Sequence, residues 1–370
     1  MRILLVTMGM DIGGAETHIL ELAKELKRRK NAVFIVSNGG KYVEELEAAG
    51  IEHIWAPLHN KKISNMMQSY KILKQTIQDK KIDLVHSHTR ISSFICGRLK
   101  EKVDFPFVTS AHWTFKVTPL LKLMTNWGEN VIAVSEDIKE YLVKNYNYPV
   151  DNIFVTVNGI DTDKFSKSID YSDIVKEFEL NQNSNRIVYI SRLDESRALV
   201  AKQLVNIAED LDRNIENLEI VIVGGGDSFE EISNKVNEIN NKLGKKLIIL
   251  TGPRTDINKF AASGDIFIGV SRAALEAMAC EQPVIVAGNE GYLGIFNETK
   301  LEKGIETNFC CRGLEMSTEE LLKRDVLDLI KKENKEEYGK YNRNIVKEYY
   351  SVEKMANDCE KAYEKTLKNH

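Results

Sequence analysis

Short runs rich in valine and isoleucine alternate with helical patterns along almost the whole chain, and this alternation restricts the fold more than any other feature. The first half holds six such runs, each followed by a helical pattern, at residues 2–7, 32–37, 51–56, 82–87, 105–110 and 130–135. Continuous apolar strands joined by crossover helices form parallel sheets covered on both faces. The first half therefore predicts an α/β domain with a doubly wound parallel sheet.

The alternation then starts again. A second set of strand patterns lies at residues 186–191, 218–226, 246–252, 265–270 and 283–288. We expect two Rossmann-like domains, 1–165 and 166–345, joined by a polar linker within 160–185, and a C-terminal helix in 346–370 that is a candidate to pack back on the first domain. Doubly wound domains bind ligands at the carboxyl ends of their strands, so two such domains facing each other would share one cleft.

Composition excludes several classes of protein. The 370 residues carry a formal net charge of −4, which disfavours nucleic-acid binding. Five cysteines without regular spacing suit a reduced compartment rather than a disulfide framework. The apolar run at the start is too short for a secretory signal, and no later run approaches the ~20 residues of a transmembrane helix. We expect a cytoplasmic protein.

Two glycines follow the first predicted strand. Gly13 and Gly14 open the next helix, where glycine lets a backbone approach a ligand and the helix N-terminus favours anions. The alternative is a tight turn that needs glycine for its own backbone. The spacing is not G-x-G-x-x-G and no acidic residue ends the second strand, so a nicotinamide site is disfavoured.

Two arginines follow the first strand of the second domain. Arg192 stands at the strand end and Arg197 lies five residues later, where a helix is expected to begin. Two guanidinium groups that converge suit a diphosphate, because each binds oxygen atoms bidentately and keeps its charge. The alternative is that both are solvated surface residues.

A glutamate stands in the apolar stretch GVSRAALEAMACEQPVIV, residues 269–286. A carboxylate in the first turn of a helix is favoured by the helix dipole, so Glu276 has a simple reading as a helix-start residue. Its neighbours in sequence are small or apolar, which leaves a ligand-binding role open as well.

Several segments, taken together in this order, resemble the retaining GT-B nucleotide-sugar glycosyltransferases of family 4. The resemblance spans nearly the whole chain and rests on GGAETHILELAKELKRRKNAV from residue 13, DLVHSH at 83–88, AVSEDIKEYL at 133–142, VNGIDTDKF at 157–165, SRLDESR at 191–197, VGGGDSFEEI at 223–232 and LEAMACEQPVIV at 275–286. It implies an N-terminal acceptor-side domain and a C-terminal nucleotide-sugar-binding domain.

The resemblance also implies roles for donor-binding residues. Glu276 matches the glutamate that holds the ribose hydroxyls of the donor, and Arg192 and Arg197 match the residues that bind its diphosphate. The backbone N–H groups of Ala273 and Ala274 would complete this cradle.

Further positions follow from the same resemblance. Arg254 is a candidate to lie against the nucleotide base, and Gly13 and Gly14 would face the phosphates from the first domain. His112 matches a histidine near the transferred sugar, and His88 would line the cleft. Each histidine has the alternative of being a satisfied core residue.

One departure from the family concerns the sugar. Family members usually carry a second glutamate eight residues before the one that matches Glu276, in a glycine-rich loop that holds the sugar hydroxyls; here Ile268 stands at that position, inside a predicted strand. The resemblance thus leaves transfer competence open. Asn289, Glu290 and Tyr292, just downstream, are candidates for replacement contacts in the cleft.

Such a site needs little side-chain chemistry, since its main task is to stabilise charge on the leaving phosphate. The resemblance implies retention of anomeric configuration, no cofactor and no metal; the D-T-D at 161–163 is interpreted as a turn and helix cap. We therefore expect a nucleotide-sugar hexosyltransferase that uses a donor such as a UDP-sugar and acts on a glycan or lipid-linked acceptor in cell-surface polysaccharide or glycolipid synthesis. A sugar-nucleotide epimerase and a non-catalytic glycosyltransferase-like partner remain alternatives.

The segment 112–128 bears on the location of the acceptor. It mixes Trp113, Phe115 and Trp127 with Lys116 and Lys122. Aromatic and basic residues together suit the interface of an anionic membrane, where the basic cluster at 24–30 would add attraction. Peripheral contact with the inner face of the plasma membrane is thus a hypothesis, and burial of the segment is its alternative.

Overall fold

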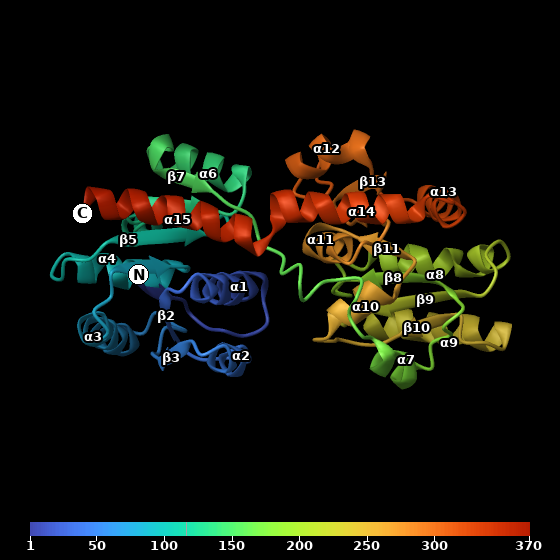
Figure 1. Ribbon diagram of the computed structural model, residues 1–370, viewed down its shortest axis with the longest axis horizontal. Helices are drawn as coiled ribbons and strands as arrows, with labels where there is room; N and C mark the ends of the chain where they lie inside the picture. Colours follow the sequence, from blue (N-terminus) through green and yellow to red (C-terminus); the bar gives the residue numbers. More distant parts are fainter. Residues whose placement is uncertain (116) are drawn as a thin grey trace. The chain divides into compact units, whose positions relative to one another are not determined.

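The computed structural model describes residues 1–115 and 117–370, which form two compact units (Figure 1). The first unit comprises Met1–Gly159 and Ser351–His370, and the second comprises Ile160–Tyr350. Residues 160–165 and 346–350 therefore belong to the second unit, whereas the sequence placed them in the first domain and in the C-terminal helix.

The first unit is built on a seven-stranded parallel sheet with the order β3-β2-β1-β4-β5-β6-β7. Its strands are β1 (Arg2–Val6), β2 (Ala32–Ser37), β3 (Glu52–Trp55), β4 (Leu84–Ser87), β5 (Phe107–Ala111), β6 (Asn130–Ala133) and β7 (Ile153–Val155). Its helices are α1 (Gly14–Arg28), α2 (Val43–Ala48), α3 (Ile63–Asp79), α4 (Arg90–Lys100), α5 (Pro119–Leu123), α6 (Glu136–Tyr146), the 3-10 turn η1 (Val150–Asn152) and α15 (Val352–Asn369).

Both faces of this sheet are covered, as continuous apolar strands require. Successive side chains of a strand point to opposite faces. Ile3 and Leu5 of β1 accordingly pack in one core with α1 and α15, while Leu4 and Val6 pack in a second core with residues of α3 and α4.

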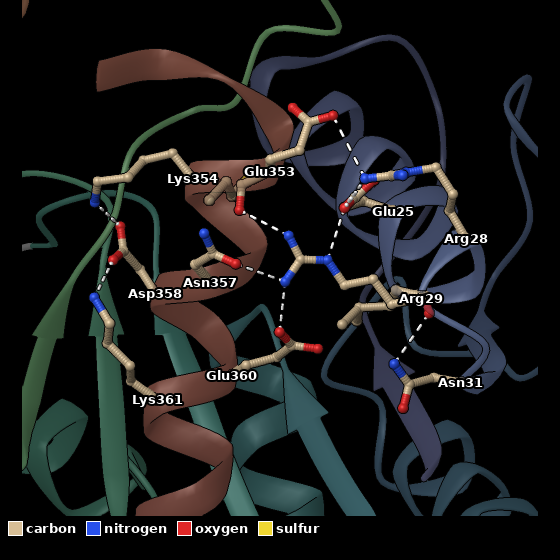
Figure 2. A network of polar contacts seen from close by, with 12 residues as sticks. Glu25, Arg28, Arg29, Asn31, Glu353, Lys354, Asn357, Asp358, Glu360 and Lys361 are labelled. Atoms are coloured by element: carbon tan, nitrogen blue, oxygen red, sulfur yellow. Dashed lines mark hydrogen bonds and ion pairs between the residues drawn. The ribbon is translucent and has the colours of Figure 1, made fainter. Parts of the chain in front are cut away.

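The last helix, α15, lies beside α1, although the whole second unit separates them in the sequence (Figure 1). Its buried face brings Met355, Cys359 and Tyr363 into the core around Ile3 and Leu5. Polar contacts centred on Arg29 fasten the two helices together at their edge (Figure 2).

The second unit holds a six-stranded sheet with the order β10-β9-β8-β11-β12-β13, in which only β13 is antiparallel to its neighbour among the described strands. Its strands are β8 (Asn185–Ile190), β9 (Leu218–Val223), β10 (Ile248–Leu250), β11 (Ile266–Gly269), β12 (Val284–Gly288) and β13 (Gly291–Ile295). Its helices are α7 (Ser172–Phe178), α8 (Leu199–Asp212), α9 (Phe229–Leu243), α10 (Ile257–Ser263), α11 (Ser271–Ala279), η2 (Glu298–Lys300), α12 (Leu301–Glu306), α13 (Glu319–Ile330), α14 (Lys335–Ile345) and the π-helical turn η3 (Val346–Tyr350).

The sequence analysis did not predict every element, and β7, α7 and β13 illustrate why. β7 has only three residues, and α7 is a two-turn helix inside the expected linker. β13 has glycine at two of its five positions, and both Gly291 and Gly294 have positive φ, so it lacks the valine and isoleucine pattern that marks the other strands.

The strand order of each sheet reverses at one place, between β1 and β4 in the first unit and between β8 and β11 in the second. Ligands of doubly wound sheets bind outside the carboxyl ends of the strands at such a switch point. Among the described residues, no helix combines the length and apolar character needed to cross a membrane.

Candidate functional site

The second unit positions two arginines directly at its switch point. Arg192 follows the end of β8, and Arg197 lies in the same loop before α8 begins at Leu199. Both side chains are exposed. Arg197 is 50% exposed, and its Nη1 lies 3.8 Å from Asp194 Oδ2. An exposed ion pair at this distance contributes little to stability. Both guanidinium groups can therefore take up an anion at little cost.

The glycine run after β9 supports this arginine loop. The N–H of Leu193 donates to Gly225 O over 2.9 Å, and the N–H of Ser228 donates to Leu193 O over 2.8 Å. A Cβ atom at Gly224 would collide with Ser191 O, and one at Gly226 would collide with the backbone of Leu193. Glycine is thus needed at both positions for the loop after β9 to contact the loop after β8. The sequence analysis did not predict this contact.

Asn289 stands next to the same loop. It follows β12, and its Oδ1 accepts a hydrogen bond from the N–H of Leu199, the first residue of α8, over 3.2 Å. The side chain therefore satisfies a helix-end donor. The sequence suggested that Asn289 contacts the donor sugar. In the structure, its side-chain oxygen accepts the hydrogen bond from Leu199 instead.

Glu276 does not stand at a helix start. It is the sixth residue of α11, no acidic residue occupies the first turn of that helix, and its side chain is buried. Its Oε1 accepts a hydrogen bond from Nε of Arg272 over 2.8 Å, one turn closer to the helix N-terminus. The helix-start reading is therefore wrong, and Arg272 is a neighbour that the sequence analysis overlooked although the i, i+4 spacing indicated it.

The turn between β11 and α11 is short and strained. Ser271, the first residue of the helix, has φ of 53°, and its N–H donates to Phe309 O over 2.7 Å. Non-glycine residues with positive φ concentrate at functional sites. The N–H of Ala274 donates to Val270 O over 3.4 Å, so it is engaged within the helix. Ala273 is the third residue of α11, and it is the one of the two predicted residues whose N–H lies in the first three positions of the helix. Ile268 is buried inside β11 as the sequence indicated.

Arg254 has structural partners within the second unit, and its expected contact with a nucleotide base stays a prediction. Its guanidinium donates two hydrogen bonds to Glu177 and two to Asp256, at 2.7 to 2.9 Å. It also lies over the rings of Phe178 and Phe260, at 5.4 and 5.6 Å from their centroids. The residue thereby joins α7 to α10 and has its donor nitrogens engaged.

Tyr292 and Glu290 are likewise accounted for within the second unit. Tyr292 is buried in the core and its hydroxyl donates to Asp325 Oδ2 over 2.8 Å, so this hydroxyl has a partner inside the unit, and its contact with a ligand stays a prediction. Glu290 lies 3.2 Å from Arg312 in an exposed ion pair. At the linker, Asp161 Oδ1 accepts from the N–H groups of Asp163 and Lys164, which makes the D-T-D segment a turn, although no helix begins there.

The first unit has its own group of residues at the switch point. Gly13 is the N-terminal cap of α1 and Gly14 is the first residue of that helix. A Cβ atom at Gly14 would meet nothing within 4 Å, and one at Gly13 would meet only the flexible end of Glu16. The packing of the first unit therefore does not require glycine at either position. That a ligand approaches the backbone here stays a prediction.

Histidines from three elements gather beside these glycines. His86 and His88 lie at the end of β4, His112 follows β5, and His18 lies in α1. The ring centroids of His88 and His112 are 5.4 Å apart, those of His18 and His112 are 4.8 Å apart, and those of His86 and His88 are 4.0 Å apart. The sequence analysis named His88 and His112 but missed His18.

Burial keeps three of these histidines neutral. It lowers the pKa of His86 to about 3 and that of His112 to about 4. The pKa of His88 lies well below its usual value because of burial and, to a lesser extent, because of the three neighbouring rings. At neutral pH all three rings therefore offer a lone pair and an N–H group.

Two family models match the chain. Glycosyltransferase Family 4 matches residues 12–164, and Glycosyl transferases group 1 matches residues 170–347. Among curated proteins, the chain is 29% identical over 255 residues to UDP-Gal:alpha-D-GlcNAc-diphosphoundecaprenol alpha-1,3-galactosyltransferase of Escherichia coli. That match covers 62% of this chain and 63% of the relative, so it spans less than two thirds of that protein.

Solved structures share the whole fold. A glycosyltransferase from Rickettsia africae ESF-5 matches with a TM-score of 0.78 and 22% identity, over 100% of this chain and 99% of that chain. The Anabaena protein HepE in complex with UDP matches with a TM-score of 0.72 and 17% identity, over 99% of this chain and 100% of that chain. The architecture of two Rossmann-like units with parallel sheets is that of these enzymes.

Proposed function

Because the chain belongs to the group 1 and family 4 glycosyltransferases of the GT-B fold, we propose that it transfers a sugar from a nucleoside diphosphate donor to a glycan or lipid-linked acceptor. The observation that carries the proposal is the loop with Arg192 and Arg197, which the glycine run after β9 supports at the switch point of the second unit.

The chemistry follows from the charges at this loop. The bond between sugar and diphosphate breaks as negative charge grows on the leaving phosphate. Preorganised guanidinium groups and helix-end amides stabilise such charge, and each donor of this kind is typically worth a factor of a hundred or more in rate. Arg192, Arg197 and the N–H of Ala273 would serve this role, and Glu276 would hold the ribose. No acid–base pair is required if the leaving phosphate itself accepts the proton of the acceptor hydroxyl, which is compatible with retention.

The donor is proposed to be a UDP-sugar and the acceptor a lipid-linked or surface glycan. Two relatives support this choice: the Escherichia coli protein is named for a UDP-Gal donor and a diphosphoundecaprenol acceptor, and HepE binds UDP. A thermal-shift series with UDP, GDP and ADP tests the base. A ligand at a hundred times its dissociation constant adds about 2.7 kcal/mol of stability, so UDP should raise the melting temperature most.

A turnover experiment then tests transfer. The protein is incubated with a UDP-sugar and a prenyl-diphosphate-linked saccharide, and products are followed by mass spectrometry. Release of UDP with a matching mass gain on the acceptor is expected. Conversion of the donor into an isomer without acceptor would instead favour the epimerase alternative.

A second candidate is a non-catalytic partner that binds a nucleotide but transfers nothing. It is favoured by Ile268, which is buried in β11 at the position where relatives place a sugar-binding glutamate. Nucleotide binding without turnover, across donors and acceptors that relatives accept, would support this candidate over an enzyme.

Peripheral membrane contact is proposed for the first unit, with a smaller surface than the sequence suggested. Trp127 is buried, and two members of the basic cluster have partners within the same unit, since Lys24 pairs with Glu45 and Arg29 with Glu360. The other basic residues of the cluster are exposed, namely Lys27, Arg28 and Lys30. Lys116 lies outside the described residues. The remaining features are Trp113, which is 68% exposed, the exposed Lys122 of α5, and a pocket near the start of α3.

That pocket combines apolar walls with basic residues, as an anionic lipid requires. Two of its lining residues, Lys61 and Arg90, are cationic, and the others are apolar. The lining residues are Lys61, Met66, Arg90, Ile91, Phe94, Leu121 and Met124. Ile63 and Met67 of α3 are exposed large apolar side chains next to it in sequence.

Flotation with liposomes tests this contact. Binding should need anionic lipid, weaken with salt and fall when Lys61 and Lys122 are both changed to glutamate, whereas the same change at Lys235 and Lys242 of the second unit should have no effect. Protein that fails to float with every lipid mixture would point to a soluble acceptor.

A further inference from the structure

Three histidine side chains of the first unit converge on one point at the switch of its sheet. One ring nitrogen from each of His18, His88 and His112 lies within 4.8 Å of the other two. From this geometry we propose that the three residues bind a divalent transition-metal ion of the zinc class. The inference concerns the first unit alone and does not depend on the transfer reaction proposed above.

The distance between two of the rings matches a metal site. His88 Nδ1 and His112 Nε2 lie 3.1 Å apart. Two nitrogen ligands about 2.0 to 2.1 Å from a tetrahedral zinc ion are separated by about 3.3 Å. In the protein without an ion, one of these nitrogens carries the hydrogen that joins them. When an ion takes its place, that hydrogen moves to the other nitrogen of the same neutral ring.

The third ring is oriented as metal-ligating histidines usually are. His18 Nδ1 lies 3.2 Å from Asn158 Oδ1, and an amide oxygen can only accept, so Nδ1 carries the hydrogen and Nε2 keeps its lone pair. Metal-bound histidines typically donate their second N–H to such an oxygen, which fixes the tautomer and the ring.

His86 supports the cluster from behind without being a ligand. Its Nδ1 pairs with the hydroxyl of Tyr363 at 2.7 Å and its Nε2 with Ser110 Oγ at 2.8 Å, so both ring nitrogens are engaged. Its ring is tilted against that of His88 at 4.0 Å. His86 is thus a positioning residue that holds His88 in place.

The second nitrogen of His88 is not part of the proposed site. His88 Nε2 is buried and has no hydrogen-bond partner among the described residues. It lies on the other side of the ring from Nδ1, so Nδ1 is the nitrogen that would bind the ion.

The chemistry of the donors selects the ion. All three donors are imidazole nitrogens, which bind metals in their neutral form. Imidazole suits Zn²⁺, Co²⁺, Ni²⁺ and Cu²⁺, whereas Mg²⁺ and Ca²⁺ prefer oxygen ligands, which this trio does not supply. His112 is only half-buried and gives the ion a route of entry. Three protein ligands would leave a fourth position for solvent.

Cobalt provides the test, because tetrahedral Co²⁺ absorbs visible light and zinc displaces it. The full chain is stripped with a chelator, exchanged into metal-free buffer and titrated with Co²⁺. We expect one ion per chain, displacement by Zn²⁺ and no competition from Mg²⁺. His88→Gln and His112→Gln should each weaken binding by about a hundredfold or more, beyond the 10- to 100-fold effect of losing an outer partner.

His59→Gln is the matched control, since it removes an imidazole of the same unit that pairs with Asn38 outside the cluster. It should bind Co²⁺ like the wild type. Tryptophan emission and far-ultraviolet circular dichroism establish that each variant is folded, and the half-buried His112 offers a milder change than His88. Absence of stoichiometric binding in the wild type, or equal binding in both cluster variants and the control, overturns the proposal.

Discussion

The guanidinium of Arg29, the C-terminal cap of α1, lies 2.5 Å from the carboxylate of Glu360 in α15. Glu360 follows the entire second unit in the sequence. The same guanidinium donates to Glu25 Oε1 over 2.7 Å, to Asn357 Oδ1 over 2.7 Å and to the carbonyl of Glu353 over 3.0 Å (Figure 2). One side chain thus contacts α15 at three points and is itself oriented by Glu25 of α1.

Replacing Arg29 with alanine should destabilise the first unit by roughly 2 to 3 kcal/mol, because charge-assisted hydrogen bonds are lost and the nearly buried Glu25 keeps fewer partners. Tryptophan fluorescence in a urea titration measures this selectively, since Trp55, Trp113 and Trp127, the only tryptophans of the chain, all belong to the first unit. Arg98→Ala is the control: Arg98 is 55% exposed and pairs with the exposed Glu101 of the same unit, so its removal should cost under about 1 kcal/mol. Equal effects of the two changes would contradict this view of the network.

Glu25 should make the stability of the first unit sensitive to acid. Burial raises the pKa of Glu25, but hydrogen bonds from Arg28 and Arg29 lower it by more, so the pKa lies below its usual value of 4.5. A carboxyl with a lowered pKa stabilises the fold at pH values above its unfolded pKa, and the contribution is lost as pH falls through the folded pKa. Glu25→Gln should therefore be destabilised at pH 7 and approach the wild type as the pH falls below 4.5 and through the lowered pKa of the folded protein. A stability difference that stays constant with pH would show that charge is not involved.

Arg197→Ala should lower the rate of transfer by a hundredfold or more while leaving the unfolding of the second unit nearly unchanged, since its ion pair with Asp194 is long and exposed. Turnover of a UDP-sugar is the measurement. Arg213→Ala, at the far end of α8 and 69% exposed, serves as the control and should retain full activity. An Arg197 variant with activity within threefold of the wild type would mark it as a surface residue.

Glu276→Gln should weaken UDP binding, because a carboxylate accepts hydrogen bonds from two ribose hydroxyls more strongly than an amide does. Its ion pair with Arg272 gives a second reason for the glutamate, and Arg272→Gln separates the two. If Glu276 binds ribose, titration calorimetry should show a larger loss of UDP affinity for Glu276→Gln than for Arg272→Gln. Equal destabilisation of the fold with unchanged UDP affinity in both variants would leave only the pairing role.

The strands that pack on both faces could be predicted, because full burial demands an uninterrupted apolar run that is visible in the sequence. β13 could not, since two of its five residues are glycines whose positive φ reflects contacts with other segments. The strand forms because it pairs with β12, and this pairing is not visible in its own sequence. α7 escaped prediction for a similar reason: it has seven residues, and it is fixed in part by Arg254, which pairs with Glu177 across a wide sequence separation.

The candidate site was predictable where the sequence marks strand ends. Arg192, His88 and His112 follow strands closely, so their position at the carboxyl edge of a sheet could be inferred. The partners of Arg254, Asn289 and Tyr292 could not, because each lies on an element that only the strand order brings near. His18 is separated from His88 and His112 by several elements, and it joins them because β1, β4 and β5 are neighbours in the sheet.

The place of α15 has a consequence for how the protein is made. A ribosome completes every residue of the second unit before it begins this helix, so the first unit leaves the exit tunnel without Met355, Cys359 and Tyr363 in its core. The apolar side of β1 and α1 stays uncovered during that interval, when nascent chains are prone to aggregate and chaperones are most useful. Tyr363 also supplies the hydroxyl that engages His86. The histidine cluster can therefore reach its final form only after the last helix has emerged, whereas the uninterrupted second unit is free to fold earlier.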